Sequence, residues 1–333
     1  MIKNKRSKVF VIVLSIVLVA CSSSGVQAEC RDLEEVDVLN VVATTPMIGE
    51  FVNQVGGNNI NLTVLMPPEA DPHTYDPAPQ DAETIANADL IFYTGLKYEP
   101  APLIKLLENS SCGVEALAEV GDAVYPIEFK ESGHDEHGDD GHDDEEEDAH
   151  AGHDHGEYDP HFWFDPNRVS YAASFIEGKL VSFDPENKES YEASYNEFAS
   201  ELKGLVNQVI EIIGTIPSQN RKIITTHESL GYLEAKFGLE VLSTIIPSLN
   251  SANEISPQDL GEVIEVIEDN KVKVIFIESE APSVYAETIV SETGIKAVKG
   301  LWVETLKQDQ TYADFLIEAI TCLLYTSDAA DES

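Results

Sequence analysis

Short apolar runs rich in β-branched residues alternate with longer segments of helical periodicity along most of the chain. In the first half, strands are predicted at residues 38–43, 61–66 and 90–93, and helices at 47–55, 80–88, 100–108 and 167–181. In the second half, strands are predicted at 222–226, 240–245, 272–277 and 296–302, and helices at 229–237, 256–270, 282–293 and 311–321. Alternation of this kind predicts parallel sheets with helices on both faces, which is an α/β fold.

One segment between the two halves has an unusually long helical pattern. Residues 186–213 contain no proline, and apolar side chains recur there at steps of three or four residues, from Tyr191 to Ile212. At about 1.5 Å per residue such a helix spans roughly 40 Å, more than one small domain needs. We therefore predict two α/β lobes with separate cores, residues 37–184 and 218–321, joined by one long rigid helix at 185–214.

The N-terminal 21 residues have the pattern of an export signal. A basic start precedes an apolar run at residues 9–20, which is shorter than the roughly 20 residues that span a bilayer. The run ends in Leu-Val-Ala-Cys, which resembles a bacterial lipobox and predicts Cys21 as a lipid-anchored first residue. An ordinary cleaved signal peptide is the alternative, and both readings place the protein outside the cytoplasm.

The other end of the chain has a composition unlike the rest. Residues 322–333 resemble a translated sequencing-library adapter, and a genuine tail is the alternative. We therefore exclude them from the predicted fold and expect the second lobe to stop near residue 321.

The charge of the chain is strongly negative and unevenly placed. With 20 Lys and Arg against 61 Asp and Glu, the formal charge of −41 opposes nucleic-acid binding and favours the handling of cations or simple solubility. Residues 131–159 alone hold 14 acids and no Lys or Arg. Of the four cysteines, Cys30 and Cys112 could pair in an oxidising compartment.

Six of the nine histidines lie in that acidic segment: His134, His137, His142, His150, His153 and His155. The segment has few apolar side chains and is expected to be a disordered loop, because it cannot bury enough surface to offset the entropy of ordering. Imidazoles and carboxylates at this density predict weak binding of divalent cations. A solvated spacer is the alternative.

The other three histidines, His73, His161 and His227, are far apart in sequence, and each lies where a predicted element ends or begins. His73 and His161 belong to Asp-Pro-His sequences, whose prolines stiffen the loops. Ligand sites of α/β proteins gather at the carboxyl ends of strands, and neutral imidazole is a good zinc ligand. Together these histidines predict a metal site between the two halves.

Several stretches then resemble the zinc- and manganese-binding proteins of metal-uptake ABC transporters, in the order of that family. They are residues 41–46 (VVATTP), 65–73 (LMPPEADPH), 88–95 (ADLIFYTG), 159–166 (DPHFWFDP), 226–233 (THESLGYL) and 275–278 (IFIE). The resemblance implies two α/β lobes joined by a long helix, with one metal ion in the cleft between them. It covers nearly the whole chain after the export signal.

The resemblance also implies the ligands. His73 and His161 match the first-lobe histidines, His227 matches the third ligand, and Glu304 stands where the family usually has an aspartate. Glu278 and Glu280 are the alternative carboxylates, and hydrogen bonding to a ligand is the plainer role for Glu278. Three imidazoles and one carboxylate favour Zn²⁺, with Mn²⁺ second because manganese prefers more oxygen ligands.

The implied function is capture of zinc by a monomeric, lipid-anchored receptor that delivers it to an ABC permease in the membrane. A manganese receptor and a metal-buffering or adhesion lipoprotein are the alternatives. A zinc hydrolase is a minor one, because the chain has neither a His-Glu-x-x-His nor a Gly-x-Ser-x-Gly motif. We therefore expect a transport protein and not an enzyme.

Overall fold

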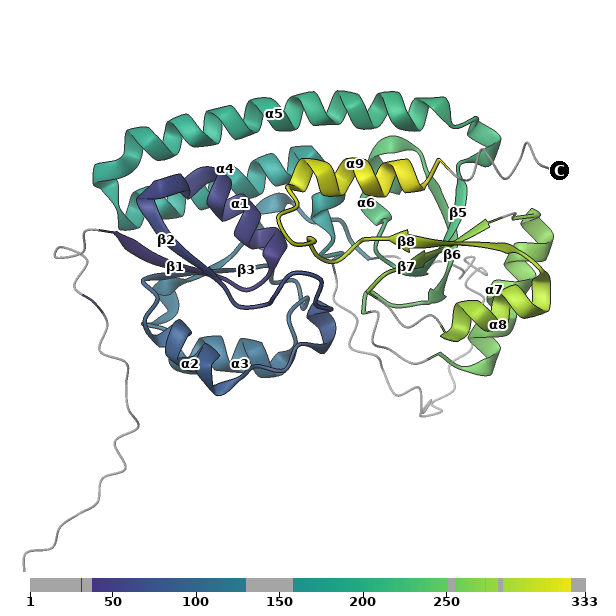
Figure 1. Ribbon diagram of the computed structural model, residues 1–333, viewed down its shortest axis with the longest axis horizontal. Coiled ribbons are helices and arrows are strands. Elements are labelled where there is room, and N and C mark those ends of the chain that lie inside the picture. The colour runs from purple at the N-terminus through teal and green to yellow at the C-terminus, as the bar shows by residue number, and fades with distance from the viewer. Residues whose placement is uncertain are drawn as a thin grey trace, which may run out of the picture.

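The computed structural model describes residues 31, 38–129, 158–250, 255–272, 274–280 and 284–324. Within this part of the chain two α/β lobes lie side by side, and one long helix runs across both (Figure 1). The predicted fold class is confirmed. No described helix has the length and apolar character needed to cross a membrane.

The first lobe is built on a four-stranded parallel sheet in the order β2-β1-β3-β4. Its strands are β1 (Leu39–Ala43), β2 (Ile60–Val64), β3 (Leu90–Tyr93) and β4 (Leu117–Glu119). Its helices are α1 (Pro46–Gly56), α2 (Pro79–Ala86), α3 (Ala101–Ser110) and α4 (Pro166–Phe183). Helices α1 and α4 cover one face of the sheet, and α2 and α3 cover the other (Figure 1).

The second lobe repeats the alternation of strands and helices. Its strands form two parallel pairs, β5 (Lys222–His227) with β6 (Glu240–Ile246) and β7 (Val274–Glu278) with β8 (Lys296–Leu301). Its helices are α6 (Gly231–Phe237), α7 (Pro257–Asn270), α8 (Val284–Thr293) and α9 (Tyr312–Cys322). Side chains help to join β5 to β7, since Thr226 Oγ1 accepts a hydrogen bond from Glu278 N at 3.0 Å.

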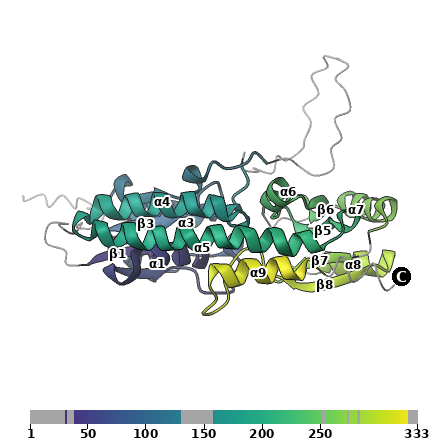
Figure 2. The same cartoon turned by 90° about the horizontal axis from the view of Figure 1, so that it is seen from above.

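The connecting helix α5 (Lys188–Thr215) starts three residues later than predicted, after a short 3₁₀ turn at Pro185–Asn187. Its buried residues recur at helical spacing along one face: Tyr191, Phe198, Ala199, Leu202, Leu205, Val209 and Ile213. This face packs on α1 and α4 in the first lobe and on α6 and α9 in the second (Figure 2). One helix therefore contacts both lobes along its length.

The apolar core does not divide as predicted. A single cluster runs through both lobes beneath α5, from Phe51 in α1 through Phe164 to Phe315 in α9, and on to Phe276 in β7. Separate smaller clusters fill the opposite side of each lobe, around Leu103 in the first and Ile267 in the second. The prediction of two separate cores is therefore wrong for the layer under the long helix.

Helix α9 is responsible for much of this continuity. It follows β8 in the chain but packs on α1 and α5, with Tyr312 edge-on to Phe51 at 5.2 Å and Phe315 beside Phe164 at 5.8 Å. The helix extends through Cys322, and Leu323 is fully buried in the shared core. These two residues, which were left out of the fold prediction, take part in the fold, whereas 325–333 lie outside the described residues.

Candidate metal centre

The two Asp-Pro-His motifs share a hydrogen bond between the aspartate side chain and the histidine backbone. The first proline-histidine pair starts a 3₁₀ turn after β2, and the Asp71 carboxylate accepts a hydrogen bond from His73 N at 2.9 Å. In the second motif Asp159 accepts from His161 N at 2.8 Å. An aspartate that accepts from the backbone two residues later forms an Asx turn. The intervening proline has no N–H that needs a partner. The aspartate hydrogen bond therefore fixes the backbone position of each histidine.

His227 is the last residue of β5 and lies beside the end of β7. Its Nδ1 atom contacts Glu278 Oε2, and its backbone N–H donates to Glu278 Oε1 at 3.3 Å. Ser229 Oγ also donates to Glu278 Oε1, at 3.2 Å. Glu278 therefore orients the imidazole of His227 and has no oxygen free of these contacts.

Glu304 lies in the loop that follows β8. The backbone N–H groups of Val303 and Glu304 both donate to Glu280 Oε1 at 3.1 Å, which fixes the loop from the end of β7. The Tyr98 hydroxyl, from the first lobe, lies 2.9 Å from both the backbone oxygen and Oε2 of Glu304. Contacts from both lobes thus hold the Glu304 side chain in place.

The sequence-predicted ligands converge. One donor atom each from His73, His161, His227 and Glu304 lies within 4.8 Å of all the others, and all four residues are buried. Glu304 Oε1 is 3.3 Å from Nε2 of His73 and of His161, and 2.5 Å from Nε2 of His227. The alternative carboxylates Glu278 and Glu280 are not part of this group.

These distances can be compared with a tetrahedral zinc site. Metal–ligand bonds of about 2.05 Å give ligand–ligand edges of about 3.3 Å. The edges from Glu304 to His73 and His161 already have this length. Of the three edges that involve Glu304, only the one to His227, at 2.5 Å, would have to lengthen to admit a cation. The donor set and spacing therefore fit a small four-coordinate cation.

Two of the three imidazoles are oriented through their other nitrogen. His161 Nδ1 lies 2.8 Å from Asp159 Oδ1, and His227 Nδ1 contacts Glu278 Oε2, so both rings direct Nε2 toward Glu304. Carboxylate–histidine pairs of this kind fix the tautomer and orientation of metal ligands. Nδ1 of His73 is buried and makes no hydrogen bond within the described residues, and the ring packs edge-on to Tyr98 at 5.0 Å.

The opposite charges of the imidazoles and carboxylates in the cluster shift the pKa values of one another. Burial alone would raise the pKa of Glu304, but His161, His73 and His227 hold it well below the usual value. Burial alone would lower the pKa of His161, but Glu304 and Asp159 raise it to about 9. The pKa of His227 is raised well above its usual value by Glu278 and Glu304, also against the effect of burial. Burial and the neighbouring carboxylates also raise the pKa of Tyr98, so its hydroxyl remains a hydrogen-bond donor at neutral pH.

Several sequence-predicted residues cannot be compared with the structure. Cys21 and the six loop histidines (His134, His137, His142, His150, His153 and His155) lie outside the described residues. Cys112 is disulfide-bonded, but its predicted partner Cys30 is also outside this range.

The sequence did not identify Tyr98, and it did not assign Asp159 a role beside His161. The repeated Asp-Pro-His motif was a usable signal for Asp159, because the aspartate precedes the histidine by two residues in both. Tyr98 lies in a segment whose side-chain pattern gave no such signal.

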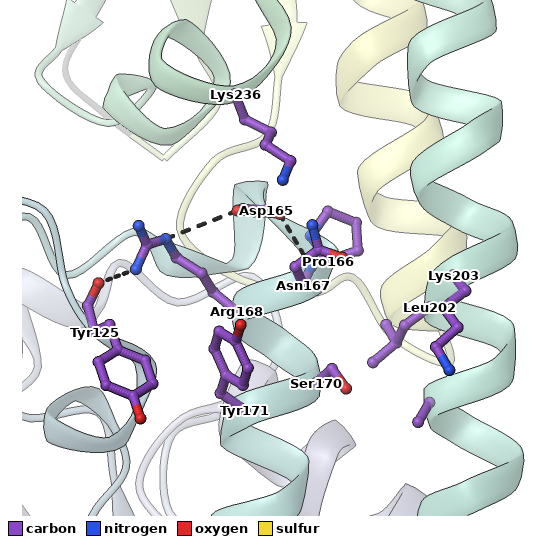
Figure 3. A pocket seen from close by; sticks show the side chains of 11 residues that line it. Tyr125, Asp165, Pro166, Asn167, Arg168, Ser170, Tyr171, Leu202, Lys203 and Lys236 are labelled. Carbon is purple, nitrogen blue, oxygen red and sulfur yellow. Dashed lines mark hydrogen bonds and ion pairs between the residues drawn. The ribbon is translucent and has the colours of Figure 1, made fainter.

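Away from the metal centre, a pocket of about 410 Å³ lies between the first lobe, α5 and α6 (Figure 3). Lys236 reaches into it from α6 and Lys203 lies on α5, while Arg168 donates to the backbone oxygens of Val124 and Tyr125. Asp165 also lines the pocket and pairs with Arg168 at 3.8 Å, so Lys203 and Lys236 leave an excess of positive charge that disfavours a cation.

The chain is similar to a known protein family and to several of its members. Residues 41–324 match the family model described as zinc-uptake complex component A, periplasmic. The manganese ABC transporter substrate-binding lipoprotein PsaA of Streptococcus mitis is 28% identical over 319 residues, which cover 93% of this chain and 94% of that protein. The iron ABC transporter substrate-binding lipoprotein MtsA of Streptococcus pyogenes serotype M1 is 27% identical over 297 residues, 87% of this chain and 86% of that protein.

The fold was also compared with solved structures. The periplasmic zinc-binding protein TroA from Treponema pallidum superposes with a TM-score of 0.74 and 23% identity, over 87% of this chain and 99% of that one. At this identity the likeness concerns the fold. The names of these three proteins specify manganese, iron and zinc, so similarity alone does not identify the metal.

Proposed function

This chain belongs to the family of zinc-uptake complex component A, and on that premise we propose that it captures Zn²⁺ outside the cytoplasm and delivers it to an ABC permease. Members of this family are the metal-binding receptors of ABC transporters and not enzymes. The choice of zinc, the ligand set and the lipid anchor are the parts that we propose.

One observation carries the proposal: three imidazole nitrogens and one carboxylate oxygen, all buried, lie within 4.8 Å of one another. Zinc accepts four ligands of this type, whereas manganese favours more oxygen atoms. Manganese remains the second candidate, because a relative that covers 93% of this chain is named as a manganese protein.

The ligands are divided equally between the lobes. His73 and His161 come from the first lobe, and His227 and Glu304 come from the second. A cation bound by all four would cross-link the lobes, and release would require their separation. Because α5 contacts both lobes along its length, we expect this movement to be small compared with a wide hinge closure.

The hydrolase alternative is weakened by the same geometry. A catalytic zinc keeps one position for water beside its protein ligands. In this cluster a fourth protein donor, Glu304 Oε1, lies within reach of all three imidazoles. A closed ligand set is suited to carrying the ion. A metal-buffering or adhesion protein could use the same four ligands. The absence of genes for a permease and an ATPase beside the gene for this chain would favour that role.

Cys21 is proposed as the lipid anchor. The lipobox-like sequence before it agrees with the lipoprotein names of the relatives. Mass spectrometry of the protein isolated from bacterial membranes would detect diacylglycerol on Cys21, whereas release of the chain into the soluble fraction would contradict the assignment.

Calorimetric titration of the purified protein with zinc and with manganese tests the metal and the site together. We expect one tight zinc site and weaker binding of manganese. His227→Ala should weaken that site by at least about a hundredfold, because it removes one of four ligands. Full-strength zinc binding by His227→Ala would overturn the ligand assignment.

The same titration with residues 131–157 deleted separates the loop from the main site. We expect the tight site to persist and only weak additional binding to disappear. Loss of the tight site on deletion would instead assign it to the loop histidines.

A further inference from the structure

Tyr98 lies at the wall of the metal centre and is almost completely buried. Its ring packs edge-on to His73 at 5.0 Å, to His161 at 6.0 Å and to Trp163 at 5.3 Å. Its hydroxyl lies 2.9 Å from Glu304 Oε2 and from the Glu304 backbone oxygen. The ring therefore packs against the ligands of the first lobe, and the hydroxyl reaches the ligand of the second.

The turn before Tyr98 has an unusual backbone. Gly95, Leu96 and Lys97 have φ angles of 77°, 53° and 62°, and the left-handed region is uncommon for residues other than glycine. Strained conformations of this kind persist only where the surrounding structure fixes them, and they cluster at functional sites.

Two buried or partly buried carboxylates fix this turn. Glu99 accepts hydrogen bonds from the backbone N–H groups of Thr94 and Gly95, at 2.7 and 3.0 Å. Glu119 accepts one from Leu96 N at 3.0 Å. The position of the Tyr98 hydroxyl is thus set by several contacts that have no part in the metal centre.

Because of Tyr98, the two oxygens of Glu304 have different surroundings. Oε1 lies among the three histidine Nε2 atoms, within 3.3 Å of each. Oε2 accepts the hydrogen bond from Tyr98. A carboxylate can bind a cation through one or both oxygens, and binding through both would raise the coordination number from four to five.

We propose that Tyr98 determines the metal specificity of the centre by holding Glu304 as a ligand with one oxygen. This inference rests on the proposed function of the site and adds the residue that selects the metal. With Oε2 held, the centre offers three nitrogens and one oxygen, a set that suits tetrahedral zinc. With Oε2 released, the centre offers a second oxygen, which favours manganese.

Tyr98→Phe tests the proposal because it removes the hydroxyl and keeps the ring that packs on His73, His161 and Trp163. We expect the ratio of zinc to manganese affinity to fall by about tenfold or more, the size of effect found when a hydrogen-bond partner of a metal ligand is removed. An unchanged ratio would overturn the proposal.

Cobalt substitution reports the coordination directly. Tetrahedral Co²⁺ absorbs visible light much more strongly than five- or six-coordinate Co²⁺. We expect strong absorption for the wild-type protein and a marked loss of intensity for Tyr98→Phe. Equal spectra for the two proteins would show that the hydroxyl does not set the coordination number.

Tyr191→Phe is the matched control. Tyr191 is also buried, and its hydroxyl donates to a carboxylate, Asp184 Oδ2, at 2.7 Å, but the pair lies at the start of the connecting helix. This variant should keep both the affinity ratio and the cobalt spectrum. Circular dichroism of both variants verifies that they are folded.

A double-mutant cycle with Glu304→Asp tests whether Tyr98 acts through this carboxylate. Aspartate is one methylene shorter and cannot reach the cation and the Tyr98 hydroxyl as glutamate does. Tyr98→Phe should therefore change the affinity ratio much less in the Glu304→Asp background. An effect of the same size in both backgrounds would show that Tyr98 acts in another way.

The outcomes separate this inference from the function on which it rests. If the wild-type protein has no tight zinc site, the proposed function fails. If the wild-type protein binds zinc tightly and Tyr98→Phe keeps its ratio and spectrum, only the role of Tyr98 is wrong.

Discussion

The two first-lobe histidines share one backbone hydrogen bond but have different ring environments. Asp71 and Asp159 each hold the N–H of their histidine, yet only Asp159 also reaches the ring nitrogen, at 2.8 Å. His161 is therefore oriented before a cation arrives, whereas the orientation of His73 depends on packing against Tyr98. The same short motif thus supplies one strongly oriented ligand and one that is freer to adjust.

The raised pKa values of the histidines determine how zinc binding responds to pH. At an imidazole with the usual pKa near 6.5, protons would compete with the cation only below neutral pH. Because the pKa of His161 is raised to about 9, this ring is protonated at pH 7 until a cation displaces its proton. We expect the apparent zinc affinity to rise between pH 7 and pH 9, by about tenfold per pH unit for each proton displaced. Competition titrations with a chelator of known pH dependence measure this slope.

Stability without zinc should change in the opposite direction. The folded-state pKa of His161 lies above the unfolded value, so its contribution to stability is complete below about pH 6.5 and is lost as pH rises through about 9. Thermal unfolding of chelator-treated protein measures this change. A zinc affinity independent of pH from 7 to 9 would show that His161 is already neutral before the cation binds.

At the scale of elements, the start of α6 packs closely against the loop that contains His161. A Cβ atom added at Gly231 would lie 2.7 Å from Asp159 Oδ2, and the neighbouring Tyr232 hydroxyl donates to the Asp159 backbone oxygen at 2.7 Å. The orientation of a first-lobe ligand therefore depends on where a second-lobe helix lies.

Gly231→Ala should displace Asp159 or α6 and weaken zinc binding, by roughly tenfold if the effect matches the loss of a ligand's hydrogen-bond partner. Gly204→Ala in α5 is the control, because a Cβ there would meet nothing within 4 Å. It should stabilise the protein by about 1 kcal/mol through helix propensity and leave zinc affinity unchanged. Equal zinc affinity in both variants would show that the α6 contact has no influence on the centre.

The elements that could be predicted from the sequence are those with a clear period. Strand β3 was predicted at its observed bounds, and the start of α7 followed from the Ser256 cap and the proline after it. The three-residue strand β4 was missed, because a run so short has no measurable alternation. The shared core was also missed, because periodicity identifies the buried face of a helix such as α9 but not the surface that it covers.

The convergence of the three proposed histidine ligands could be predicted because imidazoles and Asp-Pro-His motifs are rare and their spacing is visible. Glu304 needed the family resemblance, since one carboxylate among 61 acids has no signal of its own. Tyr98 could not be predicted, because it reaches Glu304 through a left-handed turn and a contact over 206 positions of sequence. Contacts of this range follow from the packing of the lobes and not from local pattern.

At the scale of the whole molecule, the shared core should make the lobes unfold together. The cluster beneath α5 contains side chains of both lobes and of α9, so neither lobe can expose its part without disturbing the other. We expect one calorimetric transition for the zinc-free protein, and zinc at about 1,000 times its Kd should add about 4 kcal/mol to the free energy of unfolding. Two separate transitions, with only one shifted by zinc, would contradict the shared core.

The return of α9 to the first lobe also constrains the order of events during synthesis. Residues 312–323 fill part of the core next to α1, yet they are made more than 250 positions after that helix. A nascent chain therefore cannot complete its first lobe until almost all of it has left the ribosome. Such a delay would keep the polypeptide unfolded for longer, which is compatible with the export that we propose for it.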